Sequence, residues 1–252
     1  MRAIMSSRIK ILIPARFNSS RFPGKPLALI LGRPLIVRVA EICSEAIGKE
    51  NVFVVTDDII IKKVCENHGF HAIHSVYDAQ TGTDRIGAVI NQIDADVILN
   101  VQGDEPCISR EDIFKAIKAK TQFPNHIING FCEFEAKPSN VKLSIPKVVM
   151  NESNELVYIS RANIPVDHKN QSKDLPSIFR RQVCIYAYNT EELKAFYDFS
   201  RRSDLESKED IEILRFLELG MKVKMVRMSP SIAVDYPEDI VLVEEHIKSN
   251  SN

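Results

Sequence analysis

Residues 12–27 read Leu-Ile-Pro-Ala-Arg-Phe-Asn-Ser-Ser-Arg-Phe-Pro-Gly-Lys-Pro-Leu and continue an apolar run that begins at residue 9. The run 9–13 is typical of a strand buried on both faces, and it leads into a loop that carries three cations, Arg16, Arg21 and Lys25. Small residues between them let the backbone approach a ligand closely, and cations at a strand's end suit a polyphosphate. The loop is not a Walker A motif, because the required first glycine and the final Ser/Thr are both missing. The stretch therefore predicts a buried strand followed by a polyphosphate-binding loop.

Strand-like and helix-like segments alternate through the first half of the chain. We expect strands at 9–13, 52–55 and 96–101. We expect helices at 34–48, from the end of the second strand to about residue 68, at 85–93, and from Ser109 to about residue 121. Buried strands that alternate with helices predict an α/β fold with a doubly wound, mostly parallel sheet.

The character of the sequence changes between about residues 127 and 188. Short strand-like pieces at 147–150, 156–159 and 182–188 are separated by polar loops, which predicts a smaller mixed lobe inside a single domain spanning 1–252. After the lobe, Ser207 and Asp210 are expected to cap a helix at 211–219 that Gly220 ends. A strand at 222–228 and a terminal helix at 237–248 complete the prediction.

Composition excludes several classes of protein. With 252 residues and 44% hydrophobic content the chain can bury a full core, and its 33 basic and 34 acidic residues argue against a nucleic-acid or membrane-binding surface. The five cysteines are scattered without a C-x-x-C motif, which favours a reducing compartment. The first residues lack the apolar stretch of a signal peptide, and no apolar run approaches the roughly 18–20 residues of a membrane span. We expect a cytoplasmic protein.

The first loop resembles the signature of the CMP-Kdo synthetases (3-deoxy-manno-octulosonate cytidylyltransferases; Kdo is the sugar), whose form is I-P-A-R-[YF]-x-[SA]-[ST]-R-[LF]-P-G-K-P-L. Five later motifs match the same family in order, at residues 81–85, 100–106, 160–162, 185–186 and 234–239. The match covers nearly the whole chain after the first eight residues. The resemblance implies a Rossmann-like nucleotidyltransferase fold and a homodimer to which the smaller lobe contributes.

The resemblance also implies a reaction, in which the anomeric hydroxyl of Kdo attacks the α-phosphate of CTP and pyrophosphate leaves, for lipopolysaccharide or capsule synthesis. Such chemistry depends mainly on positioning and charge neutralisation, so Arg16 and Lys25 are expected to be catalytic, while Arg21 is either a third phosphate contact or a solvated side chain. The residues expected to bind the nucleotide are Pro14, Ala15, Arg16, Ser19, Lys25, Thr81, Gly82, Thr83, Arg85 and Gln102.

Two aspartates are candidates for a magnesium site. Asp104 and Asp235 each follow a predicted strand, at the sheet edge where open α/β sheets bind ligands, and carboxylates suit Mg²⁺. Each alone is more often a turn or cap residue. The resemblance implies that both bind Mg²⁺ and take part in catalysis.

The chain departs from the family pattern on the sugar side. The residues expected to bind the sugar are Gln102, Arg161, Gln182, Tyr186, Glu209 and Glu212. Gln182 replaces a histidine associated with the sugar and Cys184 replaces a glycine, so the pocket keeps its polarity but loses a titratable cation. Further departures are Val166 in place of Trp and Tyr236 in place of Thr. Glu209 and Glu212 are expected on one helix face, where a solvated acidic surface is about as plausible as a role in the site.

These departures leave alternatives open. The same chemistry could act on 8-amino-Kdo or a nonulosonic acid. From another class, the chain could be an inactive paralogue that binds CTP, which the presence of both aspartates and of Arg16 and Lys25 argues against. A nucleotidyltransferase for an aldose phosphate is disfavoured, because Pro-Ala-Arg-Phe replaces the usual glycine-rich loop.

Overall fold

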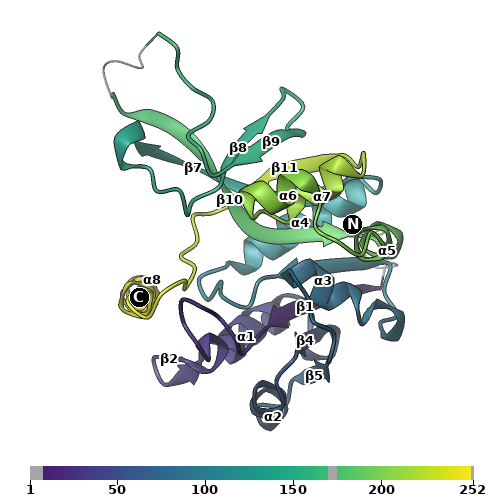
Figure 1. The fold of residues 1–252 in the computed structure, drawn as a ribbon. Helices are drawn as coiled ribbons and strands as arrows, with labels where there is room; N and C mark the ends of the chain where they lie inside the picture. The colour runs from purple at the N-terminus through teal and green to yellow at the C-terminus, as the bar shows by residue number, and fades with distance from the viewer. Residues whose placement is uncertain (1–7, 170–174, 251–252) are drawn as a thin grey trace.

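In the computed structural model, which describes residues 8–169 and 175–250, nine strands form one mixed sheet (Figure 1). The main path runs β11 (Val223–Arg227), β7 (Ile127–Ala136), β10 (Ser177–Tyr188), β6 (Val97–Val101), β1 (Ile9–Ala15), β4 (Val52–Thr56) and β5 (His71–His74). The strands β8 (Lys147–Met150) and β9 (Leu156–Ser160) attach beside β10, and β2 (Leu29–Ile30) pairs separately with β3 (Arg33–Pro34).

Most neighbouring strands on the main path are parallel. β1 pairs in parallel with β4 on one side and β6 on the other, β4 pairs in parallel with β5, and β11 in parallel with β7. The exception on the main path is β10, which runs antiparallel to both β6 and β7. The predicted α/β fold with a mostly parallel sheet is confirmed, and the three strands expected in the first half are β1, β4 and β6.

Helices cover both faces of the sheet, because the apolar side chains of β1 from Ile11 onward point alternately to opposite faces. Ile11 and Ile13 pack in a core with α1 (Leu35–Ile47), α2 (Ile59–Asn67) and α4 (Arg110–Gln122). Leu12, between them, packs in a second core with α3 (Gly82–Gly87), α5 (Thr190–Asp198) and α7 (Ile213–Glu218). The carboxyl ends of β1, β4 and β6 therefore lie at one edge, framed by helices.

The region 127–188 is built from longer strands than its sequence suggests. The segment 127–136, for which no strand was predicted, forms β7, and the strand expected at 182–188 begins five residues earlier as β10. These two strands pair over most of their length and extend away from the rest of the sheet as a twisted ribbon, beside which β8 and β9 form a hairpin (Figure 1). The strands expected at 147–150 and 156–159 are confirmed.

The prediction of one capped helix at 211–219 was wrong. Two helices occupy this region, α6 (Asp204–Glu209) and α7, and Asp210 between them has a left-handed backbone with φ of 53°. Ser203, four residues before the expected cap, begins α6 in a capping box with Glu206. Glu209 and Glu212 therefore end one helix and precede the next, and do not share a helix face.

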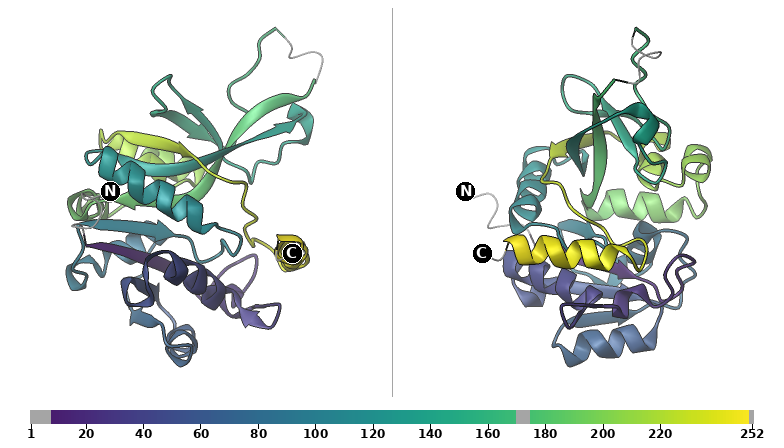
Figure 2. Two further views of the ribbon diagram at one scale, coloured as in Figure 1. Left: turned by 180° about the vertical axis from the view of Figure 1, so that it is seen from behind. Right: turned by 90° about the vertical axis from the view of Figure 1, so that its left-hand side faces the viewer.

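Two other helices begin at positions that differ from the prediction. The helix expected at 85–93 begins at Gly82, where the Thr81 hydroxyl accepts the Asp84 backbone N–H, and it ends at Gly87. The terminal helix α8 (Asp239–Asn250) lies apart from β11, beside β2, where the Glu244 carboxylate accepts the Leu31 backbone N–H (Figures 1 and 2). None of the helices within the described residues combines the length and the apolar character that a membrane crossing needs.

Candidate active site

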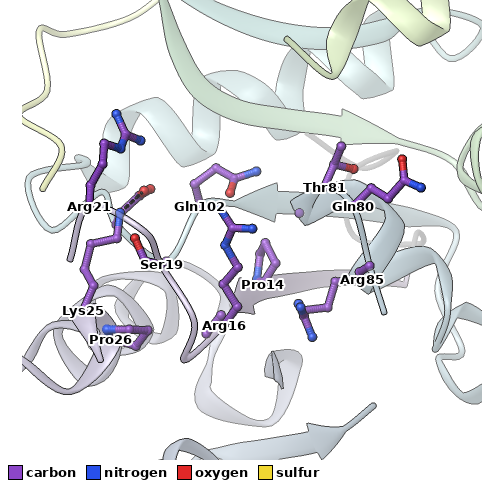
Figure 3. Close-up of a pocket in the computed structure, with 15 residues that line it drawn as sticks. Pro14, Arg16, Ser19, Arg21, Lys25, Pro26, Gln80, Thr81, Arg85 and Gln102 are labelled. Atoms are coloured by element: carbon purple, nitrogen blue, oxygen red, sulfur yellow. Dashed lines mark hydrogen bonds and ion pairs between the residues drawn. The ribbon is translucent and has the colours of Figure 1, made fainter. Parts of the chain in front are cut away.

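A pocket opens at the carboxyl edge of the sheet, where β1 and β6 end and α3 begins (Figure 3). Its lining comes from three separate parts of the chain: Pro14, Ala15, Arg16, Ser19, Arg21, Lys25 and Pro26; Ala79, Gln80, Thr81, Gly82 and Arg85; Gln102, Gly103 and Asp104. Every residue predicted to bind the nucleotide lies in this lining except Thr83, whose side chain is fully buried behind it.

The floor of the pocket depends on a close approach between β1 and the loop after β6. A Cβ atom on Gly103 would lie 2.8 Å from the backbone carbonyl oxygen of Pro14, closer than packed atoms tolerate. Gly24, in the first loop, has a left-handed backbone with φ of 70°, which favours glycine. Both glycines therefore allow the first loop to fold back over the edge of the sheet.

Lys25 ties the first loop to two distant segments. Its ammonium lies 2.7 Å from Oδ2 of Asp104 and donates to the carbonyl oxygen of Val234 at 2.8 Å. The backbone N–H of Val234 in turn donates to the carbonyl oxygen of Asp104. Asp235, the next residue, thus lies near Asp104 although 131 positions separate them in the sequence.

Asp235 is held by a second cation of the first loop, Arg21. Arg21 lies 2.8 Å from its carboxylate and stacks over the ring of Tyr236 at 5.4 Å from the centroid. Each predicted metal-binding carboxylate therefore faces a cation of the same loop, with about a third of each aspartate side chain exposed to solvent.

Two further cations line the opposite side of the pocket. Arg16 is exposed at the end of β1, whereas the side chain of Arg85 is only 5% exposed (Figure 3). Arg85 donates through Nη2 to Asp57 Oδ2 at 2.9 Å. Burial lowers the pKa of Arg85, Asp57 opposes this, and Arg16 adds to it through like-charge repulsion.

The start of α3 is anchored to α6 and α7 by buried charges. The Arg215 guanidinium, 1% exposed, donates to Asp84 Oδ1 at 2.6 Å and to both oxygens of Glu206 at 2.7 Å. The Asp84 carboxylate also accepts from the backbone N–H and hydroxyl of Thr81. Thr81 in the pocket is thereby fixed to the second core.

A chain of buried polar groups leads away from Gln102. Its Nε2 donates to Glu212 at 3.0 Å, and the same carboxylate accepts the backbone N–H of Thr83 at 3.0 Å. Burial raises the pKa of Glu212, and the hydrogen bond from the Thr83 backbone opposes this rise. Burial, with a smaller contribution from neighbouring Glu212, also raises the pKa of Tyr186 well above its usual value. Glu212 thus connects the loop after β6 to the start of α3.

Gln182 continues this chain into the sheet. Its Nε2 donates to Asn129 Oδ1 at 3.0 Å and to the Tyr186 hydroxyl at 3.3 Å. Asn129 in turn donates to the carbonyl oxygens of Val183 and Ile185, beside the irregularity in the pairing of β7 and β10. Four of the six residues predicted to bind the sugar, Gln102, Glu212, Tyr186 and Gln182, therefore lie in one neighbourhood.

The other two predicted sugar residues form a separate cluster. The Glu209 carboxylate accepts from the Ser160 hydroxyl at 2.6 Å and from the Arg161 backbone N–H at 2.9 Å. The Arg161 guanidinium donates to the backbone carbonyls of Glu209 and Asp210. These contacts join β9 to the end of α6, and the side chain of Arg161 stays one third exposed.

The donor set near Lys25 fits a magnesium ion. Carboxylate oxygens are hard ligands, and Mg²⁺ is usually held by one or two carboxylates together with substrate phosphates. Among residues 8–169 and 175–250, no group of three or more His, Cys, Asp or Glu side chains could hold a metal ion by itself. Asp104 and Asp235 each form an ion pair with a cation of the first loop. The pair therefore suits a divalent ion whose other ligands come from a phosphate.

Two carboxylates that sequence reasoning missed lie next to the pocket residues. Asp57 pairs with Arg85, and its position directly after β4, at the same sheet edge, was an available signal. Glu105 is buried behind Asp104 and accepts the Ser231 hydroxyl at 2.6 Å. Burial and the adjacent Asp104 raise the pKa of Glu105 to about 7, and no local sequence signal predicts that burial.

Comparison with known proteins gives matches that extend over most of the chain. The chain matches the cytidylyltransferase family model over residues 10–223. It is 38% identical over 248 residues to the 8-amino-3,8-dideoxy-manno-octulosonate cytidylyltransferase of Shewanella baltica, covering 95% of this chain and 98% of that protein. It is also 38% identical over 220 residues to the 3-deoxy-manno-octulosonate cytidylyltransferase of Acinetobacter baumannii, covering 84% of this chain and 87% of that protein. The solved structure of a CMP:2-keto-3-deoxy-manno-octonic acid synthetase complexed with CTP superposes with a TM-score of 0.86 at 30% identity, over 96% of this chain and 99% of that one.

Proposed function

The chain belongs to the cytidylyltransferase family, and we propose that it transfers CMP from CTP to the anomeric hydroxyl of a 3-deoxy-octulosonic acid, releasing pyrophosphate. The observation that carries the proposal is the convergence of Arg16, Lys25 and Arg85 with Asp104 in one pocket, from three separate parts of the chain. A triphosphate needs several cations to offset its charge, and this pocket supplies them at the edge of an α/β sheet.

The residues of the pocket divide the work of nucleotide binding. Arg16 and Lys25 neutralise phosphate oxygens from opposite sides, which orients the α-phosphate toward the attacking hydroxyl. The Thr81 and Gly82 region, fixed by the Asp84–Arg215 pair, lines the part of the pocket that receives the nucleoside. Displacement of Lys25 from Asp104 by the nucleotide would free that carboxylate for a metal ion.

Asp104 and Asp235 are the residues that would hold Mg²⁺. When bound there, the ion would neutralise phosphate charge and could lower the pKa of the attacking hydroxyl. Arg21 and Lys25, which face the two aspartates, would then be released toward the triphosphate.

Gln102, Gln182, Tyr186 and Glu212 are the proposed sugar-binding side chains of the inner cluster, and Arg161 and Glu209 those of the outer one. Two acids are candidates, Kdo and its 8-amino analogue, and one observation favours the second. Gln182 is a neutral side chain where the related family has a histidine, so no cation at this position would repel an ammonium group on the sugar. Relatives named for each sugar are 38% identical to this chain, the 8-amino-Kdo relative over 248 residues and the Kdo relative over 220.

A homodimer that uses the smaller lobe is part of the proposal. Large apolar side chains are more than half exposed on this lobe: Leu143, Val157, Val166 and Ile178. Exposed apolar side chains that gather on one part of a surface favour a protein contact. All five cysteines are free thiols, which supports a cytoplasmic location.

The test is to identify the product. The protein is incubated with Mg²⁺, Kdo or 8-amino-Kdo, and each of the four ribonucleoside triphosphates, and the mixture is analysed by mass spectrometry. We expect a CMP-sugar from CTP alone, accompanied by one equivalent of pyrophosphate. A sugar adduct from another nucleotide, with none from CTP, would contradict the proposal.

A further inference from the structure

One nitrogen of Arg85 is buried without a partner. Nη2 pairs with Asp57, but Nη1 has no hydrogen-bond partner, although the residue is only 4% exposed and lines the nucleotide pocket. A buried donor without an acceptor costs free energy, which an incoming acceptor recovers. Figure 3 shows the Arg85 guanidinium turned toward Arg16, on the inner side of the pocket. The unpaired N–H group is therefore available to a bound ligand.

Asp57 holds this guanidinium from behind and joins it to the first loop. While Oδ2 accepts from Arg85, Oδ1 accepts the backbone N–H of Phe17 at 3.4 Å. Phe17 directly follows Arg16, so one carboxylate at the end of β4 contacts both Arg85 and the backbone next to Arg16. It also offsets the repulsion between Arg16 and Arg85.

We propose that Asp57 is a positioning residue for nucleotide binding, which fixes Arg85 so that Nη1 donates to an oxygen atom of the bound CTP. The proposal rests on the function proposed above. Asp57 itself is not among the residues that line the pocket, and it acts on the nucleotide through Arg85. Its loss would leave Arg85 charged but without a fixed orientation, since a long side chain without its partner regains rotamer freedom.

The neighbouring residue offers a matched control. Asp58 caps α2 by accepting the backbone N–H groups of Ile60 and Ile61, and it does not line the pocket. Asp57→Ala and Asp58→Ala remove adjacent carboxylates from the same loop. Asp58→Ala should lower the melting temperature, because it removes a helix cap. It should leave the KM for CTP unchanged, because Asp58 does not line the pocket.

The experiment measures the KM for CTP, the KM for the sugar and kcat for the wild type, Asp57→Asn, Asp57→Ala and Asp58→Ala, with CTP affinity from calorimetry. We expect Asp57→Ala to raise the KM and Kd for CTP about tenfold or more, with the sugar KM unchanged. Asp57→Asn, which keeps an oxygen acceptor, should show a smaller increase.

A double variant decides whether Asp57 acts through Arg85. In an Arg85→Gln background, Asp57→Ala should raise the Kd for CTP no further. Two results would overturn the inference. One is a Kd for CTP of Asp57→Ala within about twofold of the wild type. The other is that Asp57→Ala raises this Kd by the same factor in the wild-type and Arg85→Gln backgrounds. Because binding is measured directly, the inference is decided even if the wild type releases no pyrophosphate, a result that would overturn the proposed function alone.

Discussion

The ammonium of Lys25 lies 2.7 Å from a carboxylate oxygen of Asp104, so the first loop of the chain is joined to the end of β6 by one ion pair. The same ammonium contacts the carbonyl oxygen just before Asp235. The two aspartates are thereby brought together by a side chain of the loop that we propose binds phosphate. This arrangement explains how a nucleotide and a metal ion could be received by the same set of groups.

Replacing Asp104 by asparagine tests the metal-binding part of this arrangement. An amide is a weaker ligand than a carboxylate for Mg²⁺, so Asp104→Asn should lower kcat about 100-fold or more, while CTP affinity without Mg²⁺ changes less. Asp94→Asn is the control, since Asp94 is 78% exposed and precedes β6 at its opposite end. Steady-state rates of pyrophosphate release give kcat for both variants. An Asp104→Asn enzyme as active as the control would contradict the assignment.

The parallel half of the fold was predictable because its signals are local. The apolar run at 9–13 lies within β1, which is buried from Ile11 to Ala15, and the helix expected at 34–48 is α1, one residue shorter at each end. Pro34 and Gly48 flank that helix as its caps. Such periodic and capping signals lie within one element, so a single sequence reveals them.

The antiparallel pairing of β7 with β10 could not be predicted, because the paired residues are distant in the sequence. Phe134 stacks on Phe179 across β7 and β10, and Arg180 pairs with Glu133 between the same strands. The sequence around one residue of a pair does not indicate which distant residue it contacts. The position of β10 between β6 and β7 therefore follows from tertiary packing.

The start of α6 shows how two local signals can compete. Ser203 with Glu206 and Ser207 with Asp210 have the same spacing, and the earlier pair is used. Glu206 is fully buried against Arg215, an interaction that the sequence does not show. The same limit applies to the site: motifs predicted its lining, but the Asp57–Arg85 pair and the contacts of Glu212 with Gln102 and Thr83 depend on the folded chain.

The buried Arg215 should be important for stability. Arg215→Met leaves the Asp84 and Glu206 carboxylates without their partner, which should lower the free energy of unfolding by about 3–5 kcal/mol. Arg227→Met, at an ion pair whose arginine is 71% exposed, should cost less than about 1 kcal/mol. Urea denaturation of the two variants provides the comparison. Equal losses would show that the buried network does not stabilise the fold.

Glu105 predicts how stability depends on pH. Its pKa is about 7 in the folded protein against an ordinary 4.5, so the folded state binds more protons between these values. Stability should therefore fall as pH rises from about 4.5 to about 7, by on the order of 3 kcal/mol from this group.

Glu105→Gln isolates this contribution. The amide stays neutral, so the variant should gain stability relative to the wild type as pH rises through the same window. Urea unfolding in metal-free buffer at pH 5 and pH 8 measures the difference. If the free energies of unfolding of the wild type and the variant differ by the same amount at both pH values, Glu105 keeps an ordinary pKa.

Gln182→His tests the departure on the sugar side. An imidazolium would repel an ammonium group, so the variant should lower kcat/KM for 8-amino-Kdo relative to Kdo, by about tenfold, and leave the KM for CTP unchanged. Asp94→Asn is again the control, since Asp94 is exposed, pairs with Arg8 and precedes β6 at the end opposite the pocket. A change in the KM for CTP with an unchanged sugar ratio would place Gln182 outside sugar selection.

The most direct measurement is pyrophosphate release from CTP and Mg²⁺ with Kdo, 8-amino-Kdo and a nonulosonic acid in parallel, each against a control without sugar. We expect sugar-dependent release with at least one of the two octulosonic acids, and the greater rate identifies the substrate. Measurable CTP binding without release from either octulosonic acid would contradict the proposed transfer reaction.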